Sequence, residues 1–541
     1  MKLIDQHTKA IMEGCKERAR DAGLSFEDES LEYIVSNKDL LKLSPKMMIP
    51  TLYDYWVHDV ELIKGQKIYD VYPSNPYETV INTRPPISFY NDNNPDWLNV
   101  MIFYHVIGHI DFFQNNSYFS HTWDYDFTAR ALADKRHINN LRSKYGRQVD
   151  YIIEFSRSID NLVGYHSNLS QRYSKGKENF SDRVNYYFDV FLQKELEVKT
   201  STYMKEVTSF NQKLKDSQLG EDDFFVDVEQ RYPEFPALFE KHKESNENEE
   251  HQDLIQYLLN NSTYLNKDKN KWMKTILEVI RSTSIYFQPQ IRTKIMNEGW
   301  ASYWHEKLFL QDDRIEGHEV QFAKSHAKVT SLPRVGLNPY AIGLRLFKYI
   351  EEKSNKGKFS YEFEKLKDSE QRDNYDQQKS SGLETILNVR EEFCDFTFLN
   401  NFIDQEFVTK NKLFVTGRRL NQSKMTWEYY IKSKKYQDYL KMMNESLYHP
   451  PNIEIAPDKG KDGSLYLNHA FEGKPLVQDY IKNTLFGISY LWGDTVQLET
   501  SEVESIPPME GPDDEIDETD IEWKRVVYKM EEKELTKEAI Q

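Results

Sequence analysis

Two histidines lie four residues apart in the apolar stretch YHVIGHIDFF, which runs from Tyr104 to Phe113. On a helix, His105 and His109 would share one face, which is how two imidazoles reach one metal ion. Burying a polar group without a partner costs roughly 1–3 kcal/mol, so both rings need a ligand or a hydrogen bond. The spacing therefore predicts either a metal site or a hydrogen-bonded core network, and it does not decide between them.

A carboxylate and a third histidine occur much later in the chain, in MNEGWASYWHE. Glu298, Ser302 and His305 are spaced i, i+4 and i+7, so a helix would place them on one face. Glu298 would complete a His-His-Glu metal site with His105 and His109, and His305 would serve as a proton shuttle. The alternative is a buried Glu–His pair that stabilises helix packing.

The first histidine pair departs from the H-E-x-x-H motif of zinc metalloproteases. In that motif a glutamate follows the first histidine and acts as the general base, whereas Val106 follows His105 here. A hydrolytic site would therefore take its base from elsewhere in the chain. His326, in the segment KSHAKV, is a further candidate with no special claim by its spacing. The sequence contains no G-x-S-x-G nucleophile elbow and no glycine-rich phosphate loop.

Helix formers and apolar spacing predict that mainly helices position these candidates. Helices are expected in residues 1–65, in the segment that begins at Pro95, and across 127–215 and 254–350, with short strands within 66–96. After Leu383 the pattern predicts strands in FCDFTFLNNFIDQEFV, KLFVTGRRL, SLYLNHAF and TVQLETSEV, and a helix in PLVQDYIKNTLFGISYLWG.

This pattern divides the chain into three regions. Residues 1–385 would form a mainly helical core that carries the candidate site, and residues 386–501 a small α+β domain. Residues 502–541 form an acidic tail that is expected to be disordered, with one candidate helix near its end. The predicted fold class is mainly α with a small α+β C-terminal domain, and a zincin-like site on helices is compatible with it.

The charge and composition exclude several kinds of protein. The chain has 70 Lys and Arg against 88 Asp and Glu, a net charge of −18, which disfavours binding to nucleic acid or anionic lipid. Cys15 and Cys394 provide no disulfide framework. No run of about 18 apolar residues indicates a membrane span, and the N-terminal segment lacks the apolar region of a signal peptide. We therefore expect a cytoplasmic protein.

Five parts of the sequence resemble the SpoVR family of stage V sporulation protein R-like proteins. They are YETVINTRPPISFYNDNN, HVIGHIDFFQNN, YFQPQIRTKIMNEGWASYWHE, SHAKV with GLNPYAIG, and LYLNHAF with LWGDTVQLET. The residues that fall on the family's motif positions are His105, His109, Asp111, Asn115, Asn116, Glu298, His305 and His326. The resemblance implies a link to spore cortex formation, and hence to peptidoglycan. It also implies two partners, a protein with a von Willebrand A-type domain and a serine kinase, because these are often encoded beside family members.

The first hypothesis is a metal-dependent hydrolase that acts on amide or peptide bonds of peptidoglycan or its fragments, in spore cortex or cell-envelope formation. His105, His109 and Glu298 would hold one divalent metal, for which zinc is the first expectation. Either His305 or His326 would shuttle protons or stabilise the oxyanion.

Three further residues have expected roles under this hypothesis. Asp111 would orient a ligand histidine, and Asn115 and Asn116 would bind substrate carbonyls. The second hypothesis is a regulatory or scaffold protein that works in a complex with the von Willebrand A-type partner and the kinase. The histidines and Glu298 would then form a structural network or a structural metal site.

Overall fold

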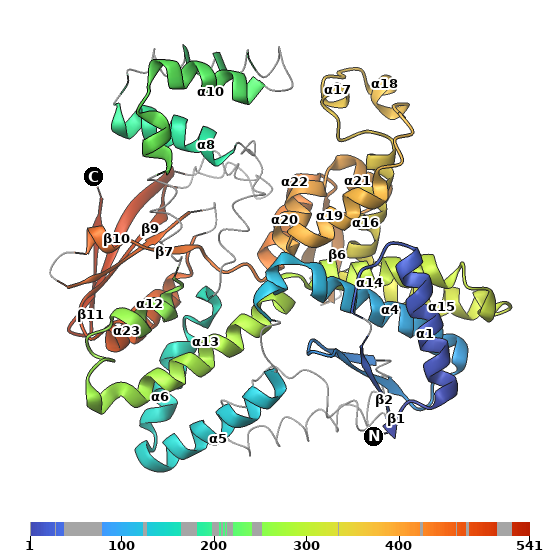
Figure 1. The fold of residues 1–541 in the computed structure, drawn as a ribbon, viewed down its shortest axis with the longest axis horizontal. Coiled ribbons are helices and arrows are strands. Elements are labelled where there is room, and N and C mark those ends of the chain that lie inside the picture. Colours follow the sequence, from blue (N-terminus) through green and yellow to red (C-terminus); the bar gives the residue numbers. More distant parts are fainter. Residues whose placement is uncertain are drawn as a thin grey trace. The chain divides into compact units, whose positions relative to one another are not determined.

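Figure 1 shows the fold of the chain in a computed structural model. The structure describes residues 2–27, 29–36, 78–122, 127–163, 181–196, 220–240, 252–333, 335–421, 426–460, 463–471, 475–505 and 522–540, with 198, 205–206, 209–210 and 213. The predictions of helix and strand that fall on residues 37–77 lie outside these described residues. Contacts divide the chain into two compact units, residues 1–170 with 253–541 and residues 171–252.

A group of helices forms the first hydrophobic core of the larger unit (Figure 1). Its central helix is α4 (Asp96–Asn115), which begins after Pro95 as predicted and in which every residue of 99–113 is buried. A helix buried on all its faces belongs inside a protein. The helices that share this core are α1 (Gln6–Asp21), α14 (Lys294–Phe309), α15 (Glu319–Thr330), α16 (Pro339–Asn355), α19 (Gly382–Glu392), α20 (Asp395–Phe402), α21 (Gln405–Lys410) and α22 (Tyr436–Ser446).

Small residues allow α14 to pack closely against both α4 and α16. A Cβ atom on Gly108 of α4 would lie 2.8 Å from the Cα of Ala301 in α14. A Cβ atom on Gly343 of α16 would lie 2.6 Å from the Cα of Gly299 in α14. Two backbones approach this closely only where a Cβ is absent or small. The two contacts bring Glu298, the neighbour of Gly299, to the α4 helix.

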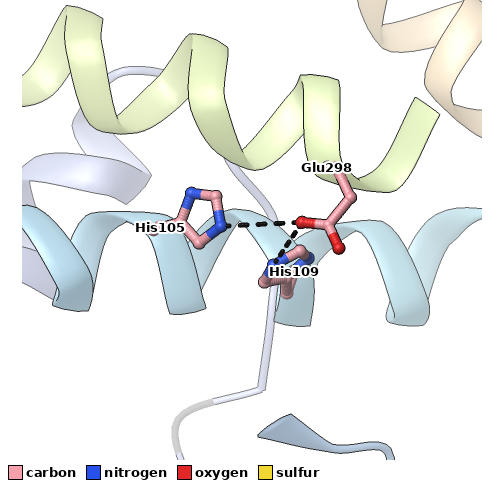
Figure 2. Close-up of side chains that lie close together, drawn as sticks. All are labelled: His105, His109 and Glu298. Atoms are coloured by element: carbon pink, nitrogen blue, oxygen red, sulfur yellow. Dashed lines mark ion pairs between the residues drawn. The ribbon is translucent and has the colours of Figure 1, made fainter. Parts of the chain in front are cut away.

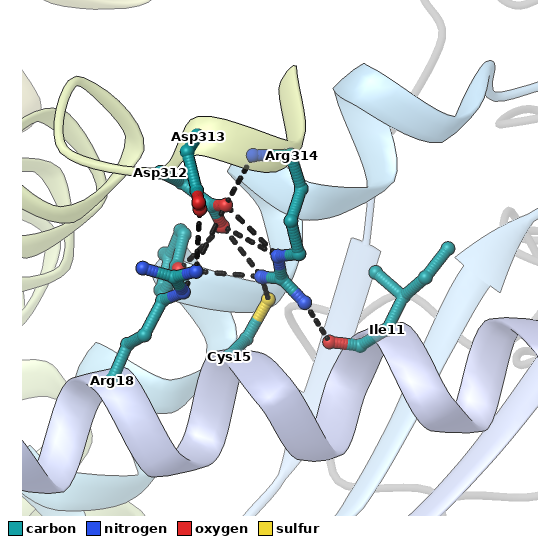
Figure 3. Close-up of polar contacts among 7 residues, drawn as sticks. Ile11, Cys15, Arg18, Asp312, Asp313 and Arg314 are labelled. Atoms are coloured by element: carbon teal, nitrogen blue, oxygen red, sulfur yellow. Dashed lines mark hydrogen bonds and ion pairs between the residues drawn. The ribbon is translucent and has the colours of Figure 1, made fainter. Parts of the chain in front are cut away.

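A polar network ties α1 and α4 to the turn that follows α14. Asp312 accepts hydrogen bonds from Arg314 Nε at 2.8 Å and from Tyr104 of α4 at 2.7 Å. Figure 3 shows how the Arg314 guanidinium also reaches α1, where it donates to Cys15 Sγ at 3.2 Å and to the carbonyl oxygen of Ile11 at 3.1 Å. Burial alone would raise the pKa of Asp312, but the hydrogen bonds from Arg314 and Tyr104 outweigh it and lower the pKa to about 2. Asp312 therefore stays ionised and holds α1 and α4 together.

The larger unit has a second core, in which helices pack with a five-stranded sheet. The sheet has the order β11-β10-β9-β8-β7, and its strands are antiparallel except for the pair β8–β9. The strands are β7 (Ile453–Ile455), β8 (Leu465–His469), β9 (Val496–Ser505), β10 (Glu522–Glu531) and β11 (Glu534–Ala539). The helices are α5 (Phe127–Tyr145), α6 (Gln148–Arg157), α12 (Leu254–Asn261), α13 (Lys271–Arg292) and α23 (Gln478–Trp492).

The two last strands correct the prediction of a disordered C-terminal tail. β10 pairs along its length with β9, and β11 returns against β10. Val526, Tyr528 and Met530 are buried and alternate along β10, which is the two-residue period of a half-buried strand. Disorder and a terminal helix are therefore wrong for residues 522–539. Residues 506–521 of the predicted tail lie outside the described part of the chain.

The N-terminal sheet corrects a second prediction. Its order is β1-β2-β4-β3, with β1 (Lys2–Leu3), β2 (Leu31–Val35), β3 (Glu78–Ile81) and β4 (Ile87–Asn91). The segment LEYIV was expected to be helical, but it forms β2 and pairs in parallel with β4, Leu31 opposite Ile87. Aromatic and β-branched residues favour such a pleated, half-buried surface.

The opposite correction applies to FCDFTFLNNFIDQEFV, which was expected to form strands. It forms α20 and α21, because local hydrogen bonds begin each helix. The hydroxyl of Thr397 accepts a bond from the Cys394 amide at 3.0 Å, and Asp404 accepts one from the Phe407 amide at 2.9 Å. Such caps satisfy backbone groups that a helix start leaves unpaired. The structure confirms the predicted strands β8, β9 and β5 (Val415–Asn421) and the predicted helix α23. The strand β5 pairs with β6 (Thr426–Ser433).

The smaller unit contains short helices around an aromatic core. They are α8 (Asp182–Asn185), the π-helix Tyr186–Glu195 and α10 (Gly220–Arg231). Tyr187 is fully buried among phenylalanines and donates a hydrogen bond to Glu206 at 3.0 Å.

The fold class is mainly α with small sheets, most of them toward the C-terminus, as the sequence predicts. The shorter elements are η1 (Ser117–Thr122), η2 (Asp160–Leu162), η4 (Asp268–Asn270), η5 (Asp313–Ile315), η6 (Pro457–Lys459), α17 (Tyr361–Glu364) and α18 (Ser369–Asp373). The boundary at 385/386 stays a prediction, and both cores of the larger unit draw residues from each side of it. Among the described helices, none has the length and apolar character needed to cross a membrane.

Gly343→Ala is expected to destabilise the protein, because its Cβ would lie 2.2 Å from the carbonyl oxygen of Ile295 and 2.6 Å from the Cα of Gly299. Overpacking of this kind costs about 1–3 kcal/mol, which exceeds the gain of about 1 kcal/mol from replacing glycine in a helix. Thermal unfolding measures the change. Gly487→Ala in α23 is the matched control, because the atom closest to its Cβ is a ring carbon of Phe155 at 3.2 Å, and the nearest backbone atom, the Phe155 Cα, lies at an ordinary contact distance of 3.5 Å. Equal melting temperatures for the two variants would contradict the close approach of α14 and α16.

Asp395→Asn is expected to change the pH dependence of stability. Asp395 accepts the amides of Ile295 and Met296 in the first turn of α14 at 2.8 and 2.9 Å. Burial outweighs these bonds and raises the pKa of Asp395 to about 7. The native state therefore keeps a proton that the unfolded chain loses above about pH 4, so the free energy of unfolding falls as pH rises from about 4 to about 7, by about 4 kcal/mol. The variant has no titrating group at this position. Its melting temperature, relative to that of the wild type, should therefore rise as the pH increases from about 4 to about 7. If the melting temperatures of the variant and the wild type changed in parallel with pH, this result would argue against a raised pKa of Asp395.

Candidate functional site

The close packing of α4 and α14 brings two histidines and a carboxylate together. Figure 2 shows His105 and His109, one turn apart on α4, facing Glu298 on α14. Glu298 Oε2 lies 3.8 Å from His105 Nε2 and 3.6 Å from His109 Nε2. One ligand atom from each residue lies within 4.8 Å of the other two. The structure therefore places all three predicted metal ligands in one cluster.

The Glu298 carboxylate is buried without a hydrogen bond at its Oε2 atom within the described part of the chain. The two ring nitrogens are too distant from this oxygen for hydrogen bonds, but their distances are close to the separation of about 3.4 Å between two ligand atoms on one tetrahedral zinc ion. Burial by itself would raise the pKa of Glu298, but hydrogen bonding from His105 and Tyr340 and the charges of His109 and His105 together outweigh it and lower the pKa. The carboxyl is therefore ionised, as a metal ligand must be.

A hydrogen bond from His109 to Asn297, the residue before Glu298 on α14, orients the ring of His109. Its Nδ1 lies 2.8 Å from Asn297 Oδ1, and an amide oxygen can only accept, so Nδ1 carries the proton. The lone pair of His109 is thereby placed on Nε2, which faces Glu298. Burial lowers the pKa of His109 to about 4, so the ring is neutral. A neutral imidazole held by its other nitrogen is the form that binds a metal.

A chain of imidazoles extends from His105 away from the cluster. His105 Nδ1 lies 2.9 Å from His305 Nδ1, and His305 Nε2 lies 2.8 Å from His326 Nδ1. His326 Nε2 lies 3.4 Å from Glu306 Oε2, which closes the chain with a carboxylate. Burial, helped by the neighbouring histidines, lowers the pKa of His305 well below its usual value.

One set of neutral tautomers satisfies every contact of this chain. If His105 donates from Nδ1, His305 accepts at Nδ1 and donates from Nε2, and His326 accepts at Nδ1 and donates toward Glu306. This assignment leaves the lone pair of His105 on Nε2, toward Glu298. Both nitrogens of His305 are used within the chain, so His305 lies beside the three-residue cluster and does not join it.

A cavity of about 360 Å³ adjoins the cluster. Its wall is mostly apolar by area, and the polar residues that line it are His105, His305, Ser325, Asn338 and Tyr340. The Tyr340 ring stacks against His105 with 6.0 Å between ring centroids. A pocket of this size with few polar groups is typical of sites for small organic ligands.

Asp111 does not contact a ligand histidine through any described hydrogen bond. Its Oδ1 accepts the Ser25 amide at 2.8 Å, its Oδ2 accepts the Trp300 indole N–H at 2.8 Å, and Arg390 lies 3.7 Å from Oδ2. Burial raises the pKa of Asp111 to about 6, although these three partners act to lower it. Asp111 therefore joins α4 to α14 and to the segment after α1. Among the described hydrogen bonds, it is Asn297 that accepts from a histidine of the cluster, His109.

The two asparagines predicted to bind substrate also have structural partners. Asn116 is buried, and its amide group donates to the carbonyl oxygens of Arg390 and Phe393 at 2.7 and 2.9 Å. Asn115 donates to the carbonyl oxygen of Ser25 at 2.7 Å. Neither residue lines the cavity beside the histidines. Asn115 is the last residue of α4, and Asn116 is its C-cap.

Three residues that contact this site were not predicted from the sequence: Asn297, Glu306 and Tyr340. Two of them lie within the quoted motif MNEGWASYWHE, one residue before Glu298 and one residue after His305. Their positions next to Glu298 and His305 in the sequence could have identified them as site residues. Tyr340 follows Pro339 at the start of α16, and no spacing links it to the histidines.

Comparisons with known proteins agree with this set of motifs. The family model described as SpoVR like protein matches residues 3–449. The protein named "Uncharacterized protein YcgB" of Escherichia coli (strain K12) is 24% identical over 492 residues, which covers 86% of each chain. No solved structure matches the chain. Because the match extends over most of its length and includes every residue of the cluster, the chain belongs to the SpoVR family.

Proposed function

We propose that this protein is a metal-dependent hydrolase in which His105, His109 and Glu298 hold one divalent metal ion. The observation that carries the proposal is the ionised, buried Glu298 oxygen, which faces two imidazole nitrogens at 3.6 and 3.8 Å and makes no hydrogen bond within the described residues. Burying an ionised carboxylate is costly, and burial is the largest single influence on the Glu298 pKa. A divalent cation between the three groups would offset that cost.

The donor set fits zinc and leaves room for chemistry. Two imidazoles and one carboxylate are the ligands of many catalytic zinc sites, in which the ion activates water and polarises a carbonyl group. Asn297 fixes His109, and His305 fixes His105, so each ring presents one nitrogen to the cluster. The apolar wall of the 360 Å³ cavity limits the water around a bound substrate.

The imidazole chain supplies the acid–base group that the absent H-E-x-x-H glutamate would provide. His305 lines the cavity and passes its second hydrogen bond to His326. Once His305 Nδ1 is released from His105, a proton taken up there would displace the Nε2 proton onto His326 Nδ1, and His326 would pass its own Nε2 proton to Glu306. In this assignment His305 faces the substrate cavity, and His326 carries the proton outward.

The substrate class that we propose is an amide or peptide bond in a peptidoglycan-related fragment, within spore cortex or cell-envelope formation. Support for the polymer comes from the resemblance to sporulation proteins. Support for a small substrate comes from the cavity, whose volume of about 360 Å³ lies toward the low end of the range for small-molecule sites.

A second candidate is a scaffold protein that binds a von Willebrand A-type partner and a serine kinase. The observation that favours it is the β5–β6 ribbon, where Tyr429, Tyr430 and Ile431 are 59%, 42% and 50% exposed. Adjacent exposed apolar side chains of this kind mark protein interaction surfaces. The cluster of His105, His109 and Glu298 would then have a structural role.

Metal content distinguishes the proposals. Protein purified without a chelator or a polyhistidine tag should contain about one equivalent of zinc or another divalent metal per chain. Glu298→Gln and His109→Gln should each lose it, because each removes a ligand, whereas the exposed control His7→Gln should retain it. Elemental mass spectrometry gives the content, and circular dichroism confirms the fold.

The outcomes differ for each hypothesis. Metal in the wild type, with hydrolysis of cell-wall peptide fragments that Glu298→Gln abolishes, supports the hydrolase. Bound metal without any turnover favours the structural role. A folded wild-type protein that takes up no metal under any loading condition would exclude the metallohydrolase and leave a hydrogen-bonded network.

Asn297 is expected to act as a positioning residue for His109. Asn297→Leu removes the acceptor of the His109 Nδ1 proton, and loss of such a partner typically lowers metal affinity about 10–100-fold. Asn297→Asp keeps an oxygen at the same place and should retain most of the affinity. Competition with a chromogenic chelator measures both constants. If Asn297→Leu binds metal as tightly as the wild type, the ring orientation does not depend on this bond.

A further inference from the structure

A second cavity, of about 420 Å³, lies where α15 meets α16. Three of its lining residues are basic: His326 on α15 and Arg345 and Lys348 on α16. In a chain with a net charge of −18, such a concentration of basic groups around one cavity needs an explanation. We propose that this cavity binds a small oxyanion, a carboxylate or a phosphate group, with Arg345 as its main contact.

Arg345 is held in place but has no anionic partner. Its NH1 atom donates to the carbonyl oxygens of Thr330 and Ala341, each at 2.9 Å. Its Nε and NH2 atoms make no hydrogen bond, and no carboxylate lies within ion-pair distance, among the residues that the structure describes. The side chain is thus fixed at one nitrogen and retains its remaining donors for a ligand.

Partial burial makes an unpaired guanidinium costly. Burial lowers the pKa of Arg345, and Glu306 is the nearest group that opposes this effect. A bound anion would offset the cost, and a guanidinium matches carboxylate and phosphate oxygens with two parallel hydrogen bonds.

The carboxylate nearest the cavity is already shared by the two other basic residues. Glu306 Oε2 lies 2.6 Å from Lys348 Nζ and 3.4 Å from His326 Nε2. Glu306 is thus shared between Lys348 and His326, and it forms no ion pair with Arg345. An anion at Arg345 would also lie near Lys348, which can turn toward it because its side chain is 46% exposed.

The proposal rests on the residues of this cavity and does not depend on a metal ion. The cavity nevertheless shares His326 with the imidazole chain. A ligand here would contact the end of the chain that lies farthest from His105. The site is therefore a second binding site, separate from the cavity lined by His105 and Tyr340.

Isothermal titration calorimetry on the full chain, at constant ionic strength, tests the proposal with inorganic phosphate and with acetate as separate probes. We expect saturable binding of at least one probe. Arg345→Gln should weaken it about tenfold or more, since a hydrogen bond to a charged group is worth that factor. Arg345→Lys should retain part of the affinity, and Lys348→Gln should have a smaller effect than Arg345→Gln.

Lys324→Gln is the matched control, because Lys324 is exposed on α15 and does not line the cavity. It changes the net charge by the same amount and should bind as the wild type does. Binding of phosphate alone or of acetate alone identifies the oxyanion. The proposal is overturned if neither probe binds the wild type, or if Arg345→Gln, shown to be folded, binds equally well. If Arg345→Gln does not fold, equal affinities of the wild type, Arg345→Lys and Lys348→Gln overturn it.

Discussion

The approach of α14 to two other helices determines where every group of the candidate site lies. α14 meets α4 at Gly108 and Ala301, and it meets α16 at Gly299 and Gly343, where no larger side chain fits. Backbones that approach so closely shorten the distance that a side chain must span. Glu298 can therefore reach the ring nitrogens of two histidines on α4 from a neighbouring helix. The same contact sets His305 beside His105.

This packing also excludes water from the buried histidines and carboxylates. Because water is excluded, these groups must form hydrogen bonds within the protein. Buried imidazoles need partners for both nitrogens or a ligand for one of them. Asn297 and His305 satisfy the Nδ1 atoms of the two α4 histidines, and the Nε2 atoms are left facing a carboxylate. Asp111 and Asp395 use their buried carboxylates differently, since each accepts protein N–H groups and joins segments far apart in the chain. Identical residue types thus serve the candidate site in one place and helix packing in another.

Strong local patterns predicted much of the fold. The buried helix after Pro95, the helix α23 and the alternating strands β8 and β9 agree with their sequence signals. The errors occurred in short segments, where apolar residues suit both helix and strand. In β2 the partner strand β4 decided the outcome, and in α20 and α21 the caps at Thr397 and Asp404 did. In the tail, the acidic composition favoured a prediction of disorder although Val526, Tyr528 and Met530 alternate as in a strand. These residues form a strand because β9 pairs with them.

The sequence by itself determined which residues were candidates for the cluster, because i, i+4 spacing on a buried helix places His105 and His109 on one face whatever surrounds them. It also determined the family, through motifs that span most of the chain. Only the tertiary structure decided that Glu298, 189 residues after His109, lies opposite that face. It likewise decided that Asn297 accepts a hydrogen bond from His109, and that His305 and His326 form a chain. Spacing along one helix is a local property, whereas contacts between helices depend on the small residues at which they meet.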